Sequence, residues 1–285
     1  MNAPIPSPRT ERARSAIAAR RARGRTTSAP PRPPLKWAGG KRWQVPHLLP
    51  LWQGHERDRL VEPFCGGLAV SLGLDPERAL LNDVNPHLIH FYTWLKRGLV
   101  AGIPMRNSER LYYAHRRRFN SIIQSDPAHP DAAALFYYLN RTGYNGLCRF
   151  NRRGEFNVPF GRYKTITYTS DFSEYARAFR KWEFTNQDFE DMRLDRNDFI
   201  YADPPYDVEF TSYAKDGFTW EDQVRTAKWL AKHAGPVVLV NQATDRIADL
   251  YAALGYRLSY LSGPRMISCT GDRTPVKEVV ATRNL

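Results

Sequence analysis

The segment Asp203-Pro204-Pro205-Tyr206 constrains the fold of this chain more than any other. It follows the apolar run 199–202, which is typical of a short buried strand. Neither proline has a backbone N–H to donate to a sheet ladder, so the strand has to end there. A carboxylate, a rigid carbonyl and an aromatic ring are therefore left together at the carboxyl end of a strand. In open α/β sheets this is the edge at which ligands bind.

The chain on either side of this strand alternates between strand and helix patterns. Strands are predicted at 60–62, 79–83, 199–202 and 237–241, helices at 68–74, 86–99, 108–123, 220–232 and 245–254, and a final hairpin within 256–282. Residues 141–163 are instead rich in Gly, Asn, Arg and aromatic side chains, with a hairpin tip predicted at 152–155. This pattern indicates an α/β sheet interrupted by an insertion, with ordered structure beginning near Pro34.

The strongest compositional signal is a formal net charge of +13 over 285 residues. Residues 1–32 hold eight arginines against the single acid Glu11, so they supply +7 of that total. Their Pro, Ser, Thr and Arg content favours a disordered basic tail over 1–33, and a non-specific clamp on phosphates is compatible with it. The remaining excess lies largely between Arg97 and Lys164, where arginines alternate with Tyr and Phe. That pattern points to nucleic acid, with a charged solvated face as the alternative.

Several classes of protein are disfavoured by the composition. No apolar run approaches the length of a membrane span, and the N-terminus has no apolar signal core, so a cytoplasmic protein is expected. The cysteines Cys65, Cys148 and Cys269 have neither metal-like nor redox spacing, and their odd number argues against a disulfide framework. We expect them to be reduced and structural.

A cofactor site is predicted from three features of the α/β regions. Glu62-Pro63-Phe64-Cys65-Gly66-Gly67 combines a strand end with a glycine-rich turn, and Asp83 follows the next strand 21 residues after Glu62. An acid at that place typically binds ribose hydroxyls, and the pair Asp188-Phe189 can hydrogen-bond and pack an adenine. The turn lacks G-x-G-x-x-G spacing, so an adenosine with a methionine tail fits better than a dinucleotide. For each acid taken alone, a helix cap or a surface salt bridge is the alternative.

These residues resemble the Dam family of DNA adenine-N6 methyltransferases, in the D12 class with the alpha order of motifs. The match covers nearly everything from Pro34 to Arg283. It rests on 35–41 (Leu-Lys-Trp-Ala-Gly-Gly-Lys), 62–64 (Glu-Pro-Phe), 82–85 (Asn-Asp-Val-Asn), 139–163 and 203–206. In that order of motifs, target recognition is inserted between the cofactor and catalytic motifs.

The resemblance implies a Rossmann-like S-adenosylmethionine-dependent methyltransferase sheet over 34–95 and 180–285. It also implies an inserted, mainly helical target-recognition domain over 96–179 that carries a β-hairpin. The partner implied is double-stranded DNA, with GATC as the expected site and no membrane. We expect a monomer that needs no metal and is associated with the nucleoid of a bacterial or phage-infected cell. A role in restriction-modification, with a cognate endonuclease, stays open.

The resemblance also assigns residues to roles, position by position. Those matching the cofactor site, which releases S-adenosylhomocysteine after reaction, are Trp37, Lys41, Phe64, Gly66, Asp83, Asp188, Phe189 and Asp203. Those matching the DNA-contacting positions are Lys36, Arg141, Tyr144, Asn145, Leu147, Arg149, Pro159 and Tyr163. The chain departs from the family at Leu68, where a further glycine is usual, and in a shorter segment after Tyr206.

The catalytic residues expected are Asp203, Pro204, Pro205 and Tyr206. An adenine amino group is a poor nucleophile, and the Asp203 carboxylate with the Pro204 carbonyl would draw its hydrogens and stabilise the developing positive charge. The base has to be flipped out of the duplex, and Tyr206 offers a ring to stack on. Arg149 is expected to read guanine, with a phosphate clamp as the alternative. The rival functions are an RNA adenine methyltransferase, a protein glutamine methyltransferase, which usually has an asparagine in place of Asp203, and a catalytically silent DNA-binding module.

Overall fold

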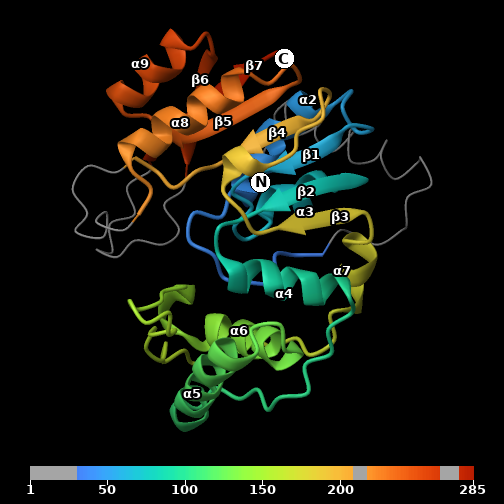
Figure 1. The fold of residues 1–285 in the computed structure, drawn as a ribbon, viewed down its shortest axis with the longest axis vertical. Coiled ribbons are helices and arrows are strands. Elements are labelled where there is room, and N and C mark those ends of the chain that lie inside the picture. The colour runs from blue at the N-terminus through green and yellow to red at the C-terminus, as the bar shows by residue number, and fades with distance from the viewer. Residues whose placement is uncertain (1–30, 208–216, 264–275) are drawn as a thin grey trace, which may run out of the picture.

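A computed structural model describes residues 31–207, 217–263 and 276–285 of the chain. Its described strands form one seven-stranded sheet in the order β3-β2-β1-β4-β5-β7-β6 (Figure 1). The first five in this order run parallel, and β7 is antiparallel to both β5 and β6. The strands are β1 (Arg59–Glu62), β2 (Arg78–Asn82), β3 (Trp182–Thr185), β4 (Phe199–Ala202), β5 (Val237–Gln242), β6 (Arg257–Gly263) and β7 (Val276–Arg283).

Two hydrophobic cores lie on the two faces of the sheet, because successive side chains of a strand point to opposite faces. In β4, Phe199 and Tyr201 enter one core, while Ile200 and Ala202 enter the other. The helices α2 (Val45–Trp52), α3 (Ala69–Leu74) and α4 (Pro86–Lys96) contribute to the first core. The helices α8 (Trp220–Ala231) and α9 (Asp245–Ala253) contribute to the second. A central strand covered on both faces has to be apolar throughout, as β4 is.

A group of helices lies outside the sheet. It comprises α5 (Glu109–Ser125) and α6 (Pro130–Thr142), followed by the short helices η2 (Tyr144–Gly146) and α7 (Ser173–Ala178). In this group α6 and α7 pack on α4 and α5 packs on α6; α6 and α5 lie below α4 in Figure 1. Between η2 and α7, the antiparallel bridge from Phe150 to Phe156 closes a hairpin with its tip at 152–154.

The fold confirms the predicted α/β sheet and most of its elements, including the strand at Phe199–Ala202 and the hairpin tip. Among the described α-helices and strands, four were not predicted, namely α2, α6, α7 and β3. β3 lies at the sheet edge and is only four residues long. α6 is buried at every position from Ala132 to Asn140, and this stretch has no exposed polar face that would mark it as a surface helix.

Some predictions fall outside the described residues, namely the basic tail up to residue 30, the turn 264–275 of the last hairpin, and Cys269. The division into catalytic and target-recognition domains stays a prediction. Within the described ranges, no helix combines the length and apolar character that crossing a membrane requires.

Candidate active site

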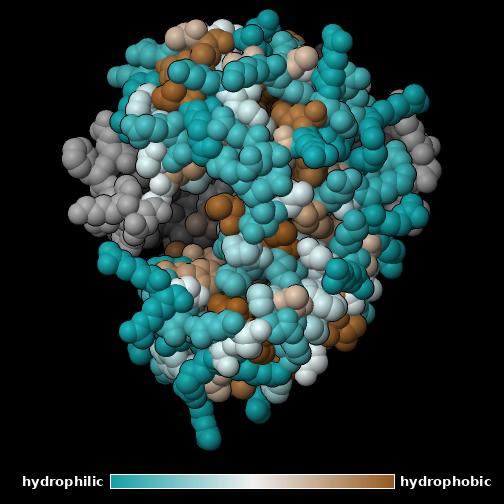
Figure 2. All heavy atoms as spheres, viewed as in Figure 1, coloured by the Kyte–Doolittle hydropathy of each residue, from teal (hydrophilic) through white to brown (hydrophobic). Residues whose placement is uncertain are grey.

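The predicted site residues gather where the parallel strands end. Asp203 follows β4, the glycine turn follows β1 and Asp83 follows β2, and parallel strands place their carboxyl ends at one edge of a sheet. Figure 2 shows the surface hollowed on the left, between the part that holds the sheet and the part that holds α5 and α6. The arrow of β3 points toward that side in Figure 1.

The loop after β4 is held from two sides by buried polar side chains. The amide of Gln223 donates to the carbonyl oxygen of Pro205 at 2.7 Å, and Asn241 donates to Gln223 at 2.9 Å. Asn241 also accepts from the backbone N–H of Asp207, whose carboxylate pairs with Arg246. The two prolines and these contacts fix the backbone on either side of Tyr206.

Asp203 faces the ammonium of Lys41, with Oδ1 3.1 Å from Nζ. Lys41 is buried and donates to the carbonyl oxygen of Gly39 at 3.1 Å. Apart from this ion pair, Asp203 Oδ1 is buried without a hydrogen-bond partner among the described residues, so it is open to a further donor. Burial raises the pKa of Asp203 to about 6, with Lys41 opposing the rise and Glu278 adding to it.

Tyr206 presents its ring beside the same ammonium, with Lys41 Nζ 4.3 Å from the ring centroid. Its hydroxyl is buried and has no hydrogen-bond partner in the part of the chain that the structure describes. Burial, together with the charges of Asp203 and Glu278, raises the pKa of this hydroxyl. The site therefore holds two buried polar atoms, on Asp203 and Tyr206, that can each take a partner from a ligand.

The glycine turn after β1 packs directly on the indole of Trp37. A Cβ on Gly66 would lie 2.8 Å from Trp37 Nε1, and one on Gly67 would lie 2.7 Å from Trp37 Cβ. Gly66 also has a positive φ of 44°. Leu68 has a positive φ of 59°, but its side chain is fully buried in the core. The departure from the family at Leu68 therefore strains the backbone and leaves the exposed part of the turn unchanged.

Asp83 closes the turn from the neighbouring strand. Its Oδ2 accepts from the backbone N–H of Gly66 at 3.1 Å, and its Oδ1 accepts from the N–H of Asn85 at 2.9 Å. Burial raises the pKa of Asp83, and these two hydrogen bonds oppose the rise. Each carboxylate oxygen has lone-pair capacity left for a hydroxyl group.

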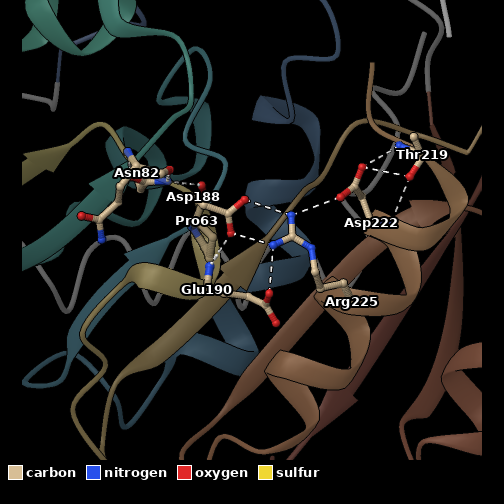
Figure 3. Close-up of polar contacts among 8 residues, drawn as sticks. Pro63, Asn82, Asp188, Glu190, Thr219, Asp222 and Arg225 are labelled. Carbon is tan, nitrogen blue, oxygen red and sulfur yellow. Dashed lines mark hydrogen bonds and ion pairs between the residues drawn. The ribbon is translucent and has the colours of Figure 1, made fainter. Parts of the chain in front are cut away.

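Asp188 is held by the guanidinium of Arg225, which lies between three acids (Figure 3). Both Asp188 oxygens accept from Arg225 at 2.9 Å, and the same guanidinium pairs with Glu190 and Asp222. Arg225 lowers the pKa of Asp188. If Asp188 contacts an adenine as predicted, its oxygens must accept that hydrogen bond with lone pairs that are not used by Arg225.

Phe189 lies beneath this cluster of charges and joins a small aromatic group. Arg225 stacks over its ring at 4.3 Å, and the ring of Phe64 lies 5.4 Å away, centroid to centroid. Phe218 contacts both rings, at 5.6 Å from Phe64 and 6.4 Å from Phe189. The structure thus brings together Phe64 and Phe189, which are 125 positions apart in the sequence.

Lys36 connects this site to the helical part through Asn140. The Asn140 side chain accepts from the N–H of Lys36 and donates to its carbonyl oxygen, both at 2.8 Å, and it also donates to the carbonyl oxygen of Gly146. Lys36 Nζ donates to the carbonyl oxygen of Arg141 at 3.0 Å and lies 3.4 Å from the ring centroid of Tyr163. Burial, followed by the charge of Arg141, lowers the pKa of Lys36 to about 8.

The other predicted DNA contacts lie around η2 and the hairpin. Tyr144 is 49% exposed, and its N–H donates to the carbonyl oxygen of the exposed Pro159 at 2.9 Å. Asn145 has a positive φ of 52° inside η2, and Leu147 follows half-buried. Arg149 is exposed at the base of the hairpin, and its Nε donates to Asn157 Oδ1 at 2.7 Å. Arg149 keeps guanidinium N–H groups available for a further acceptor.

Several residues that build the site were missed in the sequence. Glu278 on β7 and Gln44 near the N-terminus meet beside Lys41, and Tyr201 donates to Gln44. Asn140 and Arg225 position other predicted residues. Asn140 lies in the matched segment 139–163 but was given no role there, and the other four lie outside the matched segments. Only the tertiary arrangement shows what the five residues do.

Three features of the fold define the class of this protein. Its parallel sheet contains one antiparallel strand, a glycine turn follows β1, and an acid follows β2. The chain is a Rossmann-like methyltransferase of the kind that depends on S-adenosylmethionine. Residues 37–263 match the model of the D12 class of N6 adenine-specific DNA methyltransferases. The chain belongs to that family, which confirms the resemblance found in its motifs, and it is an adenine-specific DNA methyltransferase.

Relatives with described functions agree with this family. The chain is 39% identical over 270 residues to a DNA adenine methylase of Vibrio cholerae, covering 87% of this chain and 94% of that one. It is 35% identical over 272 residues to the DNA adenine methylase of Escherichia coli K12, covering 87% and 93%. It is also 34% identical over 264 residues to the retron Ec67 DNA adenine methylase of Escherichia coli, covering 87% and 90%.

The raised pKa of Asp203 predicts an acid limit for the reaction. The role expected of Asp203 needs the charged carboxylate, because protonation removes its negative charge and turns one of its two oxygens into a donor. We therefore expect kcat/KM to fall about tenfold per pH unit below a pH of about 6. The folded state binds this proton more tightly than the unfolded chain does, so Asp203 itself favours the folded state as the pH falls. A pH profile of kcat/KM, with far-UV circular dichroism at each pH, tests this. A flat profile down to pH 5 would contradict it.

Proposed function

We propose that the enzyme methylates N6 of adenine within GATC in duplex DNA, after flipping the target base out of the helix. The observation that carries this proposal is the buried Asp203 oxygen, which has no described hydrogen-bond partner beyond its ion pair with Lys41 and lies beside Tyr206 at the ligand edge of the sheet. An amino group bearing two hydrogens is a suitable partner for such an acceptor. The names of the relatives, which are DNA adenine methylases, support duplex DNA as the substrate.

The residues around the glycine turn fit S-adenosylmethionine. Trp37 lies against a turn that only glycine permits, Asp83 has capacity for ribose hydroxyls, and Phe189 offers an apolar ring beside Phe64. The carboxylates of Asp203 and Glu278 outnumber the single ammonium of Lys41, which suits a positively charged cofactor. Trp37, Lys41, Phe64, Gly66, Asp83, Asp188, Phe189 and Asp203 are the residues that would hold it. The cofactor would supply an activated methyl group on a sulfonium.

The chain's own contribution to the chemistry is to prepare the amino group. Asp203 and the carbonyl oxygen of Pro204 accept its hydrogens, which favours a pyramidal nitrogen with an available lone pair. The same acceptors stabilise the positive charge that develops on that nitrogen. A carboxylate with a pKa of about 6 is too weak a base to deprotonate the neutral amino group, so the proton leaves with or after the methyl transfer.

Binding of the flipped base and reading of the sequence are assigned to separate surfaces. The ring of Tyr206 stacks on the extruded adenine, and such stacking is worth about 1–3 kcal/mol. Arg149 reads guanine from the hairpin, while Lys36, Leu147, Pro159 and Tyr163 contact neighbouring bases. Arg141, Tyr144 and Asn145 contact phosphates or fill the space left by the flipped base. The basic tail adds phosphate contacts, and the enzyme acts as a monomer in the cytoplasm without a metal.

Substrate preference tests this proposal directly. Initial rates should be compared on a duplex oligonucleotide containing GATC, a duplex of the same composition with the site scrambled, the single strand, and the RNA version. We expect the GATC duplex to react at least about a hundredfold faster than the scrambled duplex, because each mismatched base pair costs about 1–3 kcal/mol. Exclusive activity on RNA would favour the RNA methyltransferase, and binding of DNA without any methylation would favour the silent module.

A further inference from the structure

Glu278 reaches the active site from the last strand of the chain. It lies on β7, opposite Gln242 of β5 and Leu261 of β6, and it is 7% exposed. Its Oε1 lies 3.9 Å from Lys41 Nζ, on the ammonium that also pairs with Asp203 at 3.1 Å. Lys41 is therefore shared unequally between the buried carboxylate of Glu278 and the partly buried carboxylate of Asp203.

The position of Glu278 is fixed by a chain of buried hydrogen bonds. The hydroxyl of Tyr201 donates to Gln44 Oε1 at 2.8 Å, which directs the amide nitrogen of Gln44 toward Glu278. That nitrogen donates to Glu278 Oε2. Gln44 is fully buried, so it shields the Glu278 carboxylate from solvent where the two side chains meet. A buried carboxylate that is held in this way acts as a fixed negative charge.

Lys41 has a short path between its two partners. An ammonium has three donors, and one already goes to the carbonyl oxygen of Gly39. A shift of about 1 Å toward Glu278 would bring Nζ within hydrogen-bond distance of that carboxylate. Without Glu278, Lys41 and Asp203 would form a one-to-one buried pair, and breaking such a pair is costly. The target amino group would then have to compete with Lys41 for Asp203.

We propose that Glu278 is a positioning residue that takes over Lys41 when the target adenine arrives, so that Asp203 is released to accept the amino hydrogens. This inference rests on the proposed function of Asp203. Among the described residues, the charged and titratable groups that face Asp203 are Lys41, Glu278 of β7, Glu62 of β1, Tyr201 of β4, Tyr206 and Tyr251 of α9. Of these, Glu278 is the carboxylate that shares Lys41 with Asp203.

The test is the substitution Glu278→Gln in the full chain. Glutamine has the shape of glutamate and can still accept the hydrogen bond from Gln44, but it carries no charge. Lys41 should then stay on Asp203, so the single-turnover methylation rate should fall at least about tenfold at pH 7.5. Removing a neighbouring negative charge also lowers the pKa of Asp203. The acid limb of kcat/KM should therefore move about one pH unit lower, whereas a merely structural role would leave it in place.

Asp198→Asn is the matched control, because Asp198 is an equally buried acid that pairs with Arg59 at the start of β1. It should lose thermal stability without moving the acid limb. If Glu278→Gln does not fold, Glu278→Asp keeps the charge but withdraws it from Lys41, and should give a smaller shift in the same direction. A folded Glu278 variant with the wild-type rate and acid limb overturns the inference. Full activity of Asp203→Asn would instead contradict the proposed function. The Glu278 variants therefore test the further inference, and the Asp203 variant tests the proposed function.

Discussion

Replacing Asp203 by Ala or Asn is expected to lower single-turnover methylation of a GATC duplex by about a thousandfold or more. The asparagine side chain would keep the size of the aspartate but would present only one acceptor oxygen and no charge. The negative charge is needed because the amino nitrogen becomes positive during methyl transfer, inside a site where Asp203 is largely shielded from water. The rate of methyl transfer is measured by quenched flow with labelled cofactor.

Two binding measurements separate this catalytic role from a loss of folding. Duplex affinity, followed by fluorescence anisotropy, should change little, because the proposed DNA contacts lie on η2, the hairpin and Lys36. The melting temperature should also change little, because removing the carboxylate relieves the cost of burying its charge and Lys41 keeps Glu278 as its other partner. Either variant with a methylation rate within tenfold of wild type would remove Asp203 from the mechanism.

The parts of the site that could be predicted from the sequence are those imposed by local backbone chemistry. Two consecutive prolines end a strand wherever they occur, and β4 ends at Ala202, directly before Asp203. The turn at Gly66 and Gly67 could be predicted as well, although the reason for the glycines, close approach of Trp37, appears only in the structure. Such features need no knowledge of distant segments.

The parts that could not be predicted depend on contacts between distant segments. Glu278 is an isolated acid in an apolar strand, and it meets Lys41 only because β7 inserts between β5 and β6. In the sequence, Arg225 cannot be told from an ordinary surface arginine of a helix. Its position over the ring of Phe189 appears only in the structure. α6 was not predicted because it is buried all round, between α4 and α5, so its sequence has no exposed polar face to mark it as a surface helix.

Replacing Asn140 by Ala is expected to weaken cofactor binding and DNA binding together. Asn140 is 1% exposed, and its side chain satisfies the N–H and carbonyl oxygen of Lys36 and the carbonyl oxygen of Gly146. Each buried group left without a partner costs about 1–3 kcal/mol, so the free energy of unfolding should fall by roughly 3–5 kcal/mol. Lys36 directly precedes Trp37, so loosening this segment also disturbs the indole that packs on the glycine turn. Cofactor affinity measured by calorimetry without DNA should fall about tenfold, which corresponds to about 1.4 kcal/mol.

Asn120 offers a matched control for this effect. Its side chain also accepts a backbone N–H and donates to a carbonyl oxygen, both of Phe156 in the hairpin, at 2.8 and 3.2 Å. Asn120→Ala should therefore lower the stability by a comparable mechanism and loosen the hairpin, but it should leave cofactor affinity at the wild-type value. The contrast isolates the Lys36–Trp37 segment as the link between the proposed DNA-reading surface and the glycine turn of the proposed cofactor site. Equal cofactor affinities in the two variants would show that the two surfaces are mechanically independent.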